Sequence, residues 1–155
     1  MISRSDSSIT RFLLEFCVSP TLAVTVTSVD ESLVYRTKVT RERLEKSCCR
    51  VIKRINAKCY SRGQRRKKHS IGAVTAIEGF DGRKKLHAHL AMSSPPQMSN
   101  DEFKLLVESE FSKDYWIDKQ IKIDPYRDTG WIEYITKLGP EAIAPYCLFR
   151  AFPLG

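Results

Sequence analysis

Residues 71–92 read IGAVTAIEGFDGRKKLHAHLAM, and this stretch predicts a β-hairpin whose turn is Asp81-Gly82. Its second half contains His87 and His89, two of the three histidines in the chain. Alternate side chains of a strand lie on the same face, so the two imidazoles are expected to stand side by side. Such a pair supplies two nitrogen ligands for a divalent cation.

A carboxylate would complete this metal site, and Glu78 is the preferred candidate. The turn folds the strand that carries Glu78 back beside His87 and His89, which places the three side chains close together. Asp81 is the alternative, although an aspartate in a turn more often stabilises the turn backbone. Two imidazoles and one carboxylate leave coordination positions open for phosphate oxygens. This ligand set suits Mn²⁺, Mg²⁺ could serve because it is abundant, and the ligands do not decide between them.

The rest of the chain alternates between helical and strand patterns. Helices are expected at 6–17, at 40–60, from Ser99 onward, and from Thr129 or Gly130 to Leu138; the helix at Ser99 would begin with a capping box to Glu102. Strands are expected at 21–28, 33–39, 71–80, 84–92 and 116–124. The segment 61–68 is polar and turn-like, and the last fifteen residues are too irregular to assign. The pattern predicts one α+β domain with a mainly antiparallel sheet and helices packed against it.

Composition restricts the partner and the compartment. Lys and Arg total 26 against 18 acidic residues, and the net charge of +8 favours a polyanionic partner such as nucleic acid. The cysteines are odd in number and contain no C-x-x-C pair, which predicts reduced thiols in a cytoplasmic compartment; they are Cys17, Cys48, Cys49, Cys59 and Cys147. No apolar run approaches the ~20 residues that span a membrane, and the N-terminus is not a secretory signal.

A second motif lies about fifty residues after the histidine pair. Residues 131–137 read WIEYITK, which places Tyr134 and Lys137 three apart on one face of a helix. A His-x-His strand followed by Tyr-x-x-Lys in a small basic protein resembles the HUH endonucleases, in particular the rolling-circle replication initiators (Rep proteins) of plasmids and small viruses. The resemblance covers roughly residues 20–140 and leaves 141–155 as a tail.

The resemblance implies the HUH version of a ferredoxin-like or RRM-like fold and a tyrosine nuclease that acts on single-stranded DNA. Tyr134 would attack a DNA phosphate, leaving a 5′-phosphotyrosine and a free 3′-hydroxyl that can later rejoin the strand. Lys137 and the metal would stabilise the developing charge. Only one tyrosine occupies this helix, so a second transfer would require a second subunit, Tyr126 or Tyr146.

A basic run between the long helix and the hairpin is expected to contact the DNA backbone; it consists of Arg62, Arg65, Arg66, Lys67 and Lys68. The natural substrate would be an origin of replication, in which a stem-loop could present the single strand. The chain leaves no room for a helicase domain after the tyrosine helix, so a host helicase and polymerase would act with it.

Simpler interpretations remain open. A His-x-His pair taken alone is more often two surface imidazoles than a metal site, and Tyr134 could be a core aromatic. A non-catalytic RRM-like module that binds RNA or single-stranded DNA would share the charge and the fold. A relaxase or transposase of the HUH superfamily is a further alternative.

Overall fold

An antiparallel sheet forms the centre of the molecule in the computed structural model, which describes residues 11–16, 20–29, 39–79, 85–126, 130–137 and 140–153. Its four strands are β1 (Leu22–Thr27), β2 (Gly72–Glu78), β3 (His87–Ser93) and β4 (Lys122–Pro125), in the spatial order β2-β3-β1-β4. The predicted α+β class and antiparallel sheet are confirmed.

Helices alternate with these strands. They are α2 (Arg41–Cys59), α3 (Arg62–Arg66), α4 (Asn100–Ser112) and α5 (Gly130–Thr136), with a further helical segment at residues 11–16 and two 3₁₀ turns, η1 (Pro140–Ala142) and η2 (Pro145–Cys147). The order β1-α2-β2-β3-α4-β4 is the βαββαβ arrangement of ferredoxin-like domains.

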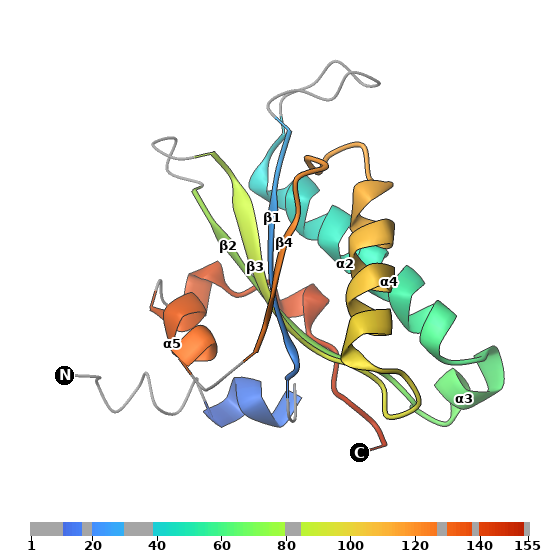
Figure 1. Cartoon of the computed structure of the whole chain (residues 1–155). Helices are drawn as coiled ribbons and strands as arrows, with labels where there is room; N and C mark the ends of the chain where they lie inside the picture. Colours follow the sequence, from blue (N-terminus) through green and yellow to red (C-terminus); the bar gives the residue numbers. More distant parts are fainter. Residues whose placement is uncertain are drawn as a thin grey trace.

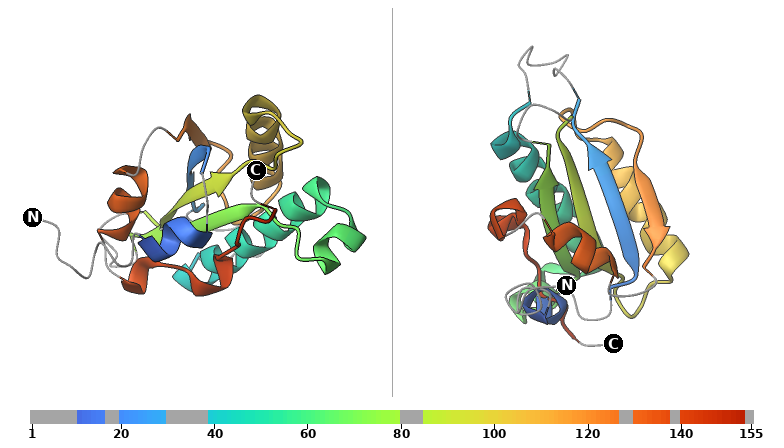
Figure 2. Two further views of the ribbon diagram at one scale, coloured as in Figure 1. Left: turned by 90° about the horizontal axis from the view of Figure 1, so that it is seen from below. Right: turned by 90° about the vertical axis from the view of Figure 1, so that its left-hand side faces the viewer.

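The sheet separates two layers of helix (Figures 1 and 2). Helices α2 and α4 cover one face, and their apolar side chains pack on the strand residues Val24, Leu90 and Ile123 in the larger core. Helix α5, η1 and residues 11–16 lie on the other face, where Ile132 and Leu13 pack on β2 and β3. Because alternate strand residues face opposite layers, this arrangement fixes which side chains point toward α5.

The two long helices begin where the sequence indicates. Thr40 accepts a hydrogen bond from the Arg43 amide, and Ser99 accepts one from the Glu102 amide, so both helices have an N-cap. The expected capping box at Ser99 forms only in part. The Ser99 hydroxyl donates to the Glu102 carboxylate, instead of the carboxylate accepting from the Ser99 amide.

Two expected elements are correct only in part. Residues 61–68 are not merely turn-like, because Ser61 and Gln64 form a reciprocal capping box that begins helix α3. The strand expected at 116–124 begins only at Lys122. Asp114 and Asp118 accept hydrogen bonds from amides two residues ahead, which curls this segment into turns before the strand starts.

The end of the chain, which the sequence left unassigned, lies along the outer edge of β2. Phe149 and Ala73 exchange two backbone hydrogen bonds of 2.9 Å, and Ser70 pairs with Phe152 in the same way. This segment therefore covers the edge of β2 that would otherwise expose unpaired backbone groups.

Some predictions fall outside the described residues. These are the strand expected from Leu33, the Asp81-Gly82 turn with the alternative ligand Asp81, Cys17, and the exact ends of the helices expected at 6–17 and at Thr129 to Leu138. In the part of the chain that is described, Cys48, Cys49, Cys59 and Cys147 are free thiols. No described helix combines the length and the apolar character needed to cross a membrane.

Candidate metal site

Glu78, His87 and His89 come together at one end of the β2–β3 pair, on the face that α5 covers. Glu78 is the last residue of β2 and lies directly opposite His87, the first residue of β3. His89 is two residues further along β3 and therefore points to the same side. The strand period and the hairpin pairing thus produce the cluster.

The three side chains have the spacing of metal ligands. One carboxylate oxygen of Glu78 (Oε2) lies 3.0 Å from Nε2 of His87 and 3.1 Å from Nε2 of His89. The ligand atoms of all three residues lie within 4.8 Å of one another. Two ligands at right angles, each about 2.1 Å from a small divalent cation, would be about 3.0 Å apart. The cluster can therefore hold such a cation.

The other ring nitrogen of each histidine contacts an oxygen. Nδ1 of His87 donates to the carbonyl oxygen of Lys85 at 2.8 Å, and Nδ1 of His89 lies 3.1 Å from the Thr25 hydroxyl oxygen. A proton on Nδ1 leaves the lone pair of Nε2 directed at the cluster, which is how metal-binding histidines are usually oriented. The carbonyl oxygen of Lys85 thus places the proton of His87 on Nδ1, and the Thr25 hydroxyl orients the His89 ring, so both Nε2 atoms face Glu78.

Thr25 is a residue of the site that the sequence did not reveal. It lies on β1, directly opposite His89 in the β1–β3 pairing. The predicted strand at 21–28 includes it, but nothing in the sequence states which strand pairs with β3 on its second side.

The ionisation of the cluster favours cation binding. Burial would raise the pKa of Glu78, but hydrogen bonds with His89 and His87 and their charges outweigh burial, and the pKa lies below its ordinary value. Burial lowers the pKa of His89 from 6.5, and the charges of His87 and Lys137 lower it further, against the opposing effect of Glu78. An ionised carboxylate and a neutral imidazole are the forms that bind metals.

Tyr134 lies beside this cluster on helix α5. Its ring centroid is 5.4 Å from that of His89, and 41% of the residue is exposed, so it is not a core aromatic. The ring stacks on Trp131 with the planes only 10° apart. Trp131 in turn donates its indole N–H to the carbonyl of Leu90 on β3, which ties α5 to the strand that carries both histidines.

Lys137 also belongs to the site. Its ammonium nitrogen lies 3.6 Å from the centroid of the Tyr134 ring, a cation–π contact. The same Tyr134 ring contacts His89, and the charge of Lys137 lowers the pKa of His89. The structure therefore brings the Tyr-x-x-Lys motif and the His-x-His motif into one site.

The predicted DNA-contacting run is not in this site. Arg62, Arg65 and Arg66 form helix α3, and all five basic side chains of the run, through Lys67 and Lys68, are exposed. Helix α3 precedes the start of β2, whereas Glu78 ends that strand (Figure 1). The seven residues of β2 therefore place Glu78 roughly 20 Å from α3.

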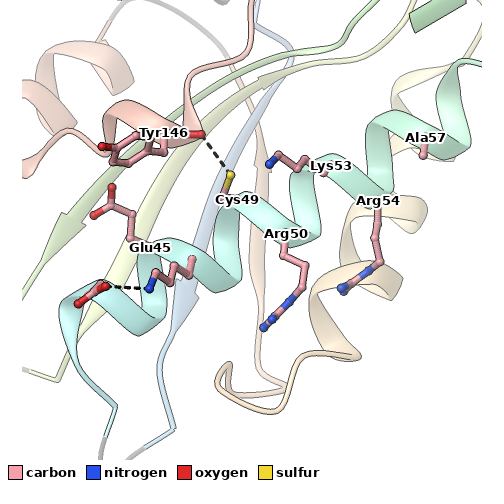
Figure 3. A pocket seen from close by; sticks show the side chains of 9 residues that line it. Glu45, Cys49, Arg50, Lys53, Arg54, Ala57 and Tyr146 are labelled. Carbon is pink, nitrogen blue, oxygen red and sulfur yellow. Dashed lines mark hydrogen bonds and ion pairs between the residues drawn. The ribbon is translucent and has the colours of Figure 1, made fainter. Parts of the chain in front are cut away.

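The two alternative tyrosines lie in different places. Tyr126 lines a hollow that Tyr134 also lines. Tyr146 is 81% exposed and lines a groove along the outer side of α2, where its carbonyl accepts a hydrogen bond from Cys49 (Figure 3). Since α2 and α5 cover opposite faces of the sheet, Tyr126 is the only one of these two on the side of the metal cluster.

Comparison of the chain with models of protein families, with curated proteins and with solved structures found no match. The assignment of a function therefore depends on the geometry of the site itself.

Proposed function

We propose that this protein is a divalent-cation-dependent endonuclease that cuts single-stranded DNA with the hydroxyl of Tyr134 as nucleophile. The observation that carries the proposal is the convergence on one face of the sheet of three metal ligands, Glu78, His87 and His89, with a half-exposed tyrosine. A structural tyrosine would not need a lysine on its ring or a cluster of cation ligands beside it.

Each residue has a part in the cut. The Tyr134 oxygen forms a bond to phosphorus as the bond from phosphorus to the 3′-oxygen breaks, the phenol proton passes to solvent, and the 3′-oxygen takes up a proton. Lys137 stabilises negative charge as it develops on the phenol and the phosphate. Trp131 holds the Tyr134 ring in place by stacking. A cation held by the three ligands would polarise the scissile phosphate and stabilise the leaving oxygen.

The cation would be Mn²⁺ or Mg²⁺, because one carboxylate and two imidazoles with open positions suit a cation that also binds phosphate oxygens. The cellular role that fits this chemistry is initiation of rolling-circle replication at an origin, with a host helicase and polymerase completing the process. The covalent intermediate conserves the energy of the cut linkage, so the same site could rejoin the strand.

A non-catalytic RRM-like module is the alternative from another class. Such sheets bind bases through aromatic side chains on their central strands. The residues of β1 and β3 that point toward α5 in the described strands include Thr25, Thr27, His87 and His89, and none of them is a phenylalanine, tyrosine or tryptophan. This composition supports a reaction centre more than a stacking platform.

The test is covalent capture of DNA. The protein is incubated with Mn²⁺ and a pool of single-stranded stem-loops of random loop sequence, labelled at either the 5′ or the 3′ end, and run on a denaturing gel. We expect the 3′ label to move with the protein and the 5′ label to be released on a shorter fragment. EDTA and Tyr134→Phe should abolish the adduct, whereas Tyr146→Phe, the matched control on the opposite face of the sheet, should retain it.

Two results would contradict the proposal. An adduct that survives in Tyr134→Phe would assign the nucleophile to another residue. Binding of the pool without any adduct, at every metal tested, would favour the non-catalytic module.

A further inference from the structure

A hollow of about 540 Å³ opens between helix α5 and strand β4, next to Tyr134. Its lining includes Tyr126, Trp131 and Tyr134, together with Ala23 of β1 and Asp124 and Pro125 of β4. We refer to it as the α5–β4 hollow. It lies next to the cluster of Glu78, His87 and His89, because Tyr134 lines the hollow and its ring also contacts His89.

The hollow lies on the part of the sheet that the helices leave open. Ala23 and Asp124 are paired across β1 and β4, and their neighbours Val24 and Ile123 point into the core on the α2 side. Ala23 and Asp124 therefore point toward the α5 side. In Figure 2, most of β1 and β4 is seen on that side with no described helix in front, while α5 lies toward β2 and β3.

The lining has the chemistry of a site for a flat, polar ring. Three aromatic side chains line the hollow, and because the Tyr134 ring already contacts Trp131 and Lys137, the surfaces for stacking are Trp131 and Tyr126. Aromatic side chains stack on bases of single strands and tolerate every base. The acidic group in the lining is Asp124, whose side chain is 59% exposed and lies 3.8 Å from Lys122.

A carboxylate in such a place discriminates between bases. It accepts hydrogen bonds from amino groups, which adenine, cytosine and guanine carry. Thymine instead presents two carbonyl oxygens, which a carboxylate repels, on either side of a single N–H.

We propose that the α5–β4 hollow holds an unstacked base of the single strand next to the scissile phosphate, and that Asp124 selects bases with an exocyclic amino group over thymine. The inference deepens the proposed nuclease function, and depends on it only for the statement that the base flanks the cut. Asp124 is a specificity-determining residue in this scheme, and Trp131 forms the stacking wall.

The test measures base binding without any cutting. Trp116→Phe leaves Trp131 as the one remaining tryptophan, since the chain has two, so its fluorescence reports on the hollow. In EDTA, short oligonucleotides dA₄, dC₄ and dT₄ are titrated separately. We expect quenching of Trp131 and binding of dA₄ and dC₄ about tenfold tighter than dT₄. Anisotropy of labelled oligonucleotides with the wild-type chain measures the same preference if the variant folds poorly.

The variant Asp124→Asn should remove most of this preference, because an amide offers both a donor and an acceptor. Asp101→Asn, which neutralises an exposed aspartate on α4, should leave the preference unchanged. Equal affinity for the three oligonucleotides, or a preference that survives in Asp124→Asn, would overturn the inference.

The failure of this inference is distinguishable from failure of the proposed function. A DNA adduct on Tyr134 with no base preference at Asp124 would overturn the inference about the hollow alone. A preference lost in Asp124→Asn without any adduct would support the hollow and overturn the nuclease.

Discussion

The Thr25 hydroxyl orients His89 in the way that the carbonyl oxygen of Lys85 orients His87. Each oxygen contacts Nδ1 of one imidazole and leaves Nε2 directed at Glu78. The two partners differ in kind, because a backbone carbonyl can only accept a hydrogen bond, whereas a hydroxyl can donate or accept. The orientation of His89 therefore depends on a side chain that mutation can remove.

Thr25→Val should weaken metal binding by about 10- to 100-fold, because the hydrogen bond to the second ring nitrogen holds the imidazole in the orientation that binds the cation. Calorimetric titration with Mn²⁺ would measure the affinity, and thermal unfolding would check that the sheet is intact. Thr27→Val is the matched control. Thr27 lies on the same face, opposite His87, whose Nδ1 already donates to Lys85. Equal affinity for Mn²⁺ in Thr25→Val and the wild type would show that Thr25 does not contribute to the site.

The sequence reveals the local part of this site and misses the part built from distant strands. Glu78, His87 and His89 are joined by one hairpin, so strand alternation and the turn were enough to predict their convergence. Thr25 meets His89 across a pairing of strands 64 residues apart, which no local pattern specifies. The stacking of Trp131 on Tyr134 likewise depends on how α5 docks on β3.

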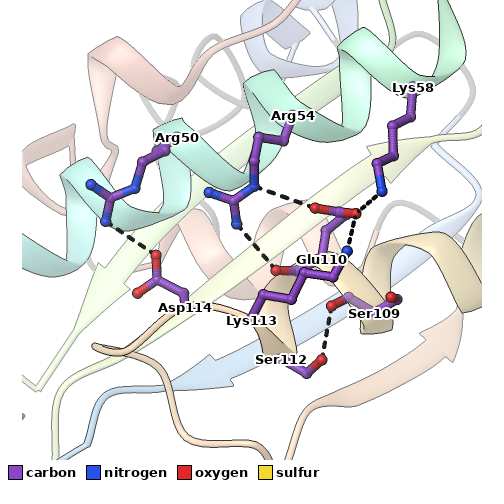
Figure 4. A network of polar contacts seen from close by, with 8 residues as sticks. All are labelled: Arg50, Arg54, Lys58, Ser109, Glu110, Ser112, Lys113 and Asp114. Carbon is purple, nitrogen blue, oxygen red and sulfur yellow. Dashed lines mark hydrogen bonds and ion pairs between the residues drawn. The ribbon is translucent and has the colours of Figure 1, made fainter. Parts of the chain in front are cut away.

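At the level of elements, α2 and α4 are joined by a buried carboxylate. Glu110 is 1% exposed and forms ion pairs with Arg54 and Lys58 of α2 and with Lys113, while Arg50 pairs with Asp114 (Figure 4). Burial would raise the pKa of Glu110, but hydrogen bonds from Lys58, Lys113 and Arg54 outweigh it and lower the pKa from 4.5 to about 2.

This network predicts a pH-dependent contribution to stability. Since the pKa is lower in the folded state, the contribution is complete above about pH 4.5 and is lost as the pH falls toward 2. Glu110→Gln should lower the free energy of unfolding by about 2 kcal/mol at pH 7, a moderate value because the cationic partners are half-exposed. Urea unfolding at pH 7 and pH 3 should show the deficit shrinking by more than half. A deficit equal at both pH values would mean that charge pairing is not its cause.

The C-terminal segment protects the edge of β2 through backbone hydrogen bonds, and Phe149 provides both a donor and an acceptor. Phe149→Pro removes the donor, whereas Phe149→Ala removes the ring but keeps the backbone group. We expect the proline variant to be less stable than the alanine variant by about 3 kcal/mol in chemical unfolding. It should also associate more readily in size-exclusion chromatography, because the β2 edge is then partly exposed. Equal stability of the two variants would show that the pairing contributes nothing.

Elements with strong periodicity were predicted well, and those set by particular side-chain hydrogen bonds were not. The long helix α2 and strands β1 to β3 lie close to their expected bounds. Helix α3 depends on the reciprocal bonds of Ser61 and Gln64, and the late start of β4 depends on Asp114 and Asp118. Such contacts compete with the apolar alternation that suggested a strand.

For the whole molecule, the densest run of exposed positive charge and the candidate site lie at opposite ends of β2. Most cations of α2 that line its outer groove have acidic partners, since Lys46 pairs with Glu42, and Arg50 and Arg54 pair with α4. The segment 62–68 carries five exposed cations and no acidic residue. A single strand that reaches from the metal cluster to α3 would therefore cross roughly 20 Å of the molecule before it meets this charge.

Because of this separation, we expect the cations of α3 to contribute to the binding of long strands and not to the binding of short ones. The double variant Arg65→Gln and Arg66→Gln should weaken binding of a strand of about thirty nucleotides and flatten the dependence of log affinity on log salt by about 0.7 per lost contact. Binding of a strand of about six nucleotides, long enough for the site alone, should be unchanged. The control Lys104→Gln with Lys119→Gln removes the same charge from exposed positions outside α3, and it should alter neither slope. If the α3 variant weakened the binding of short and long strands equally, the basic segment would act by general electrostatic attraction. If it weakened neither, the segment would be a solvated surface and the strand would follow another path from the site.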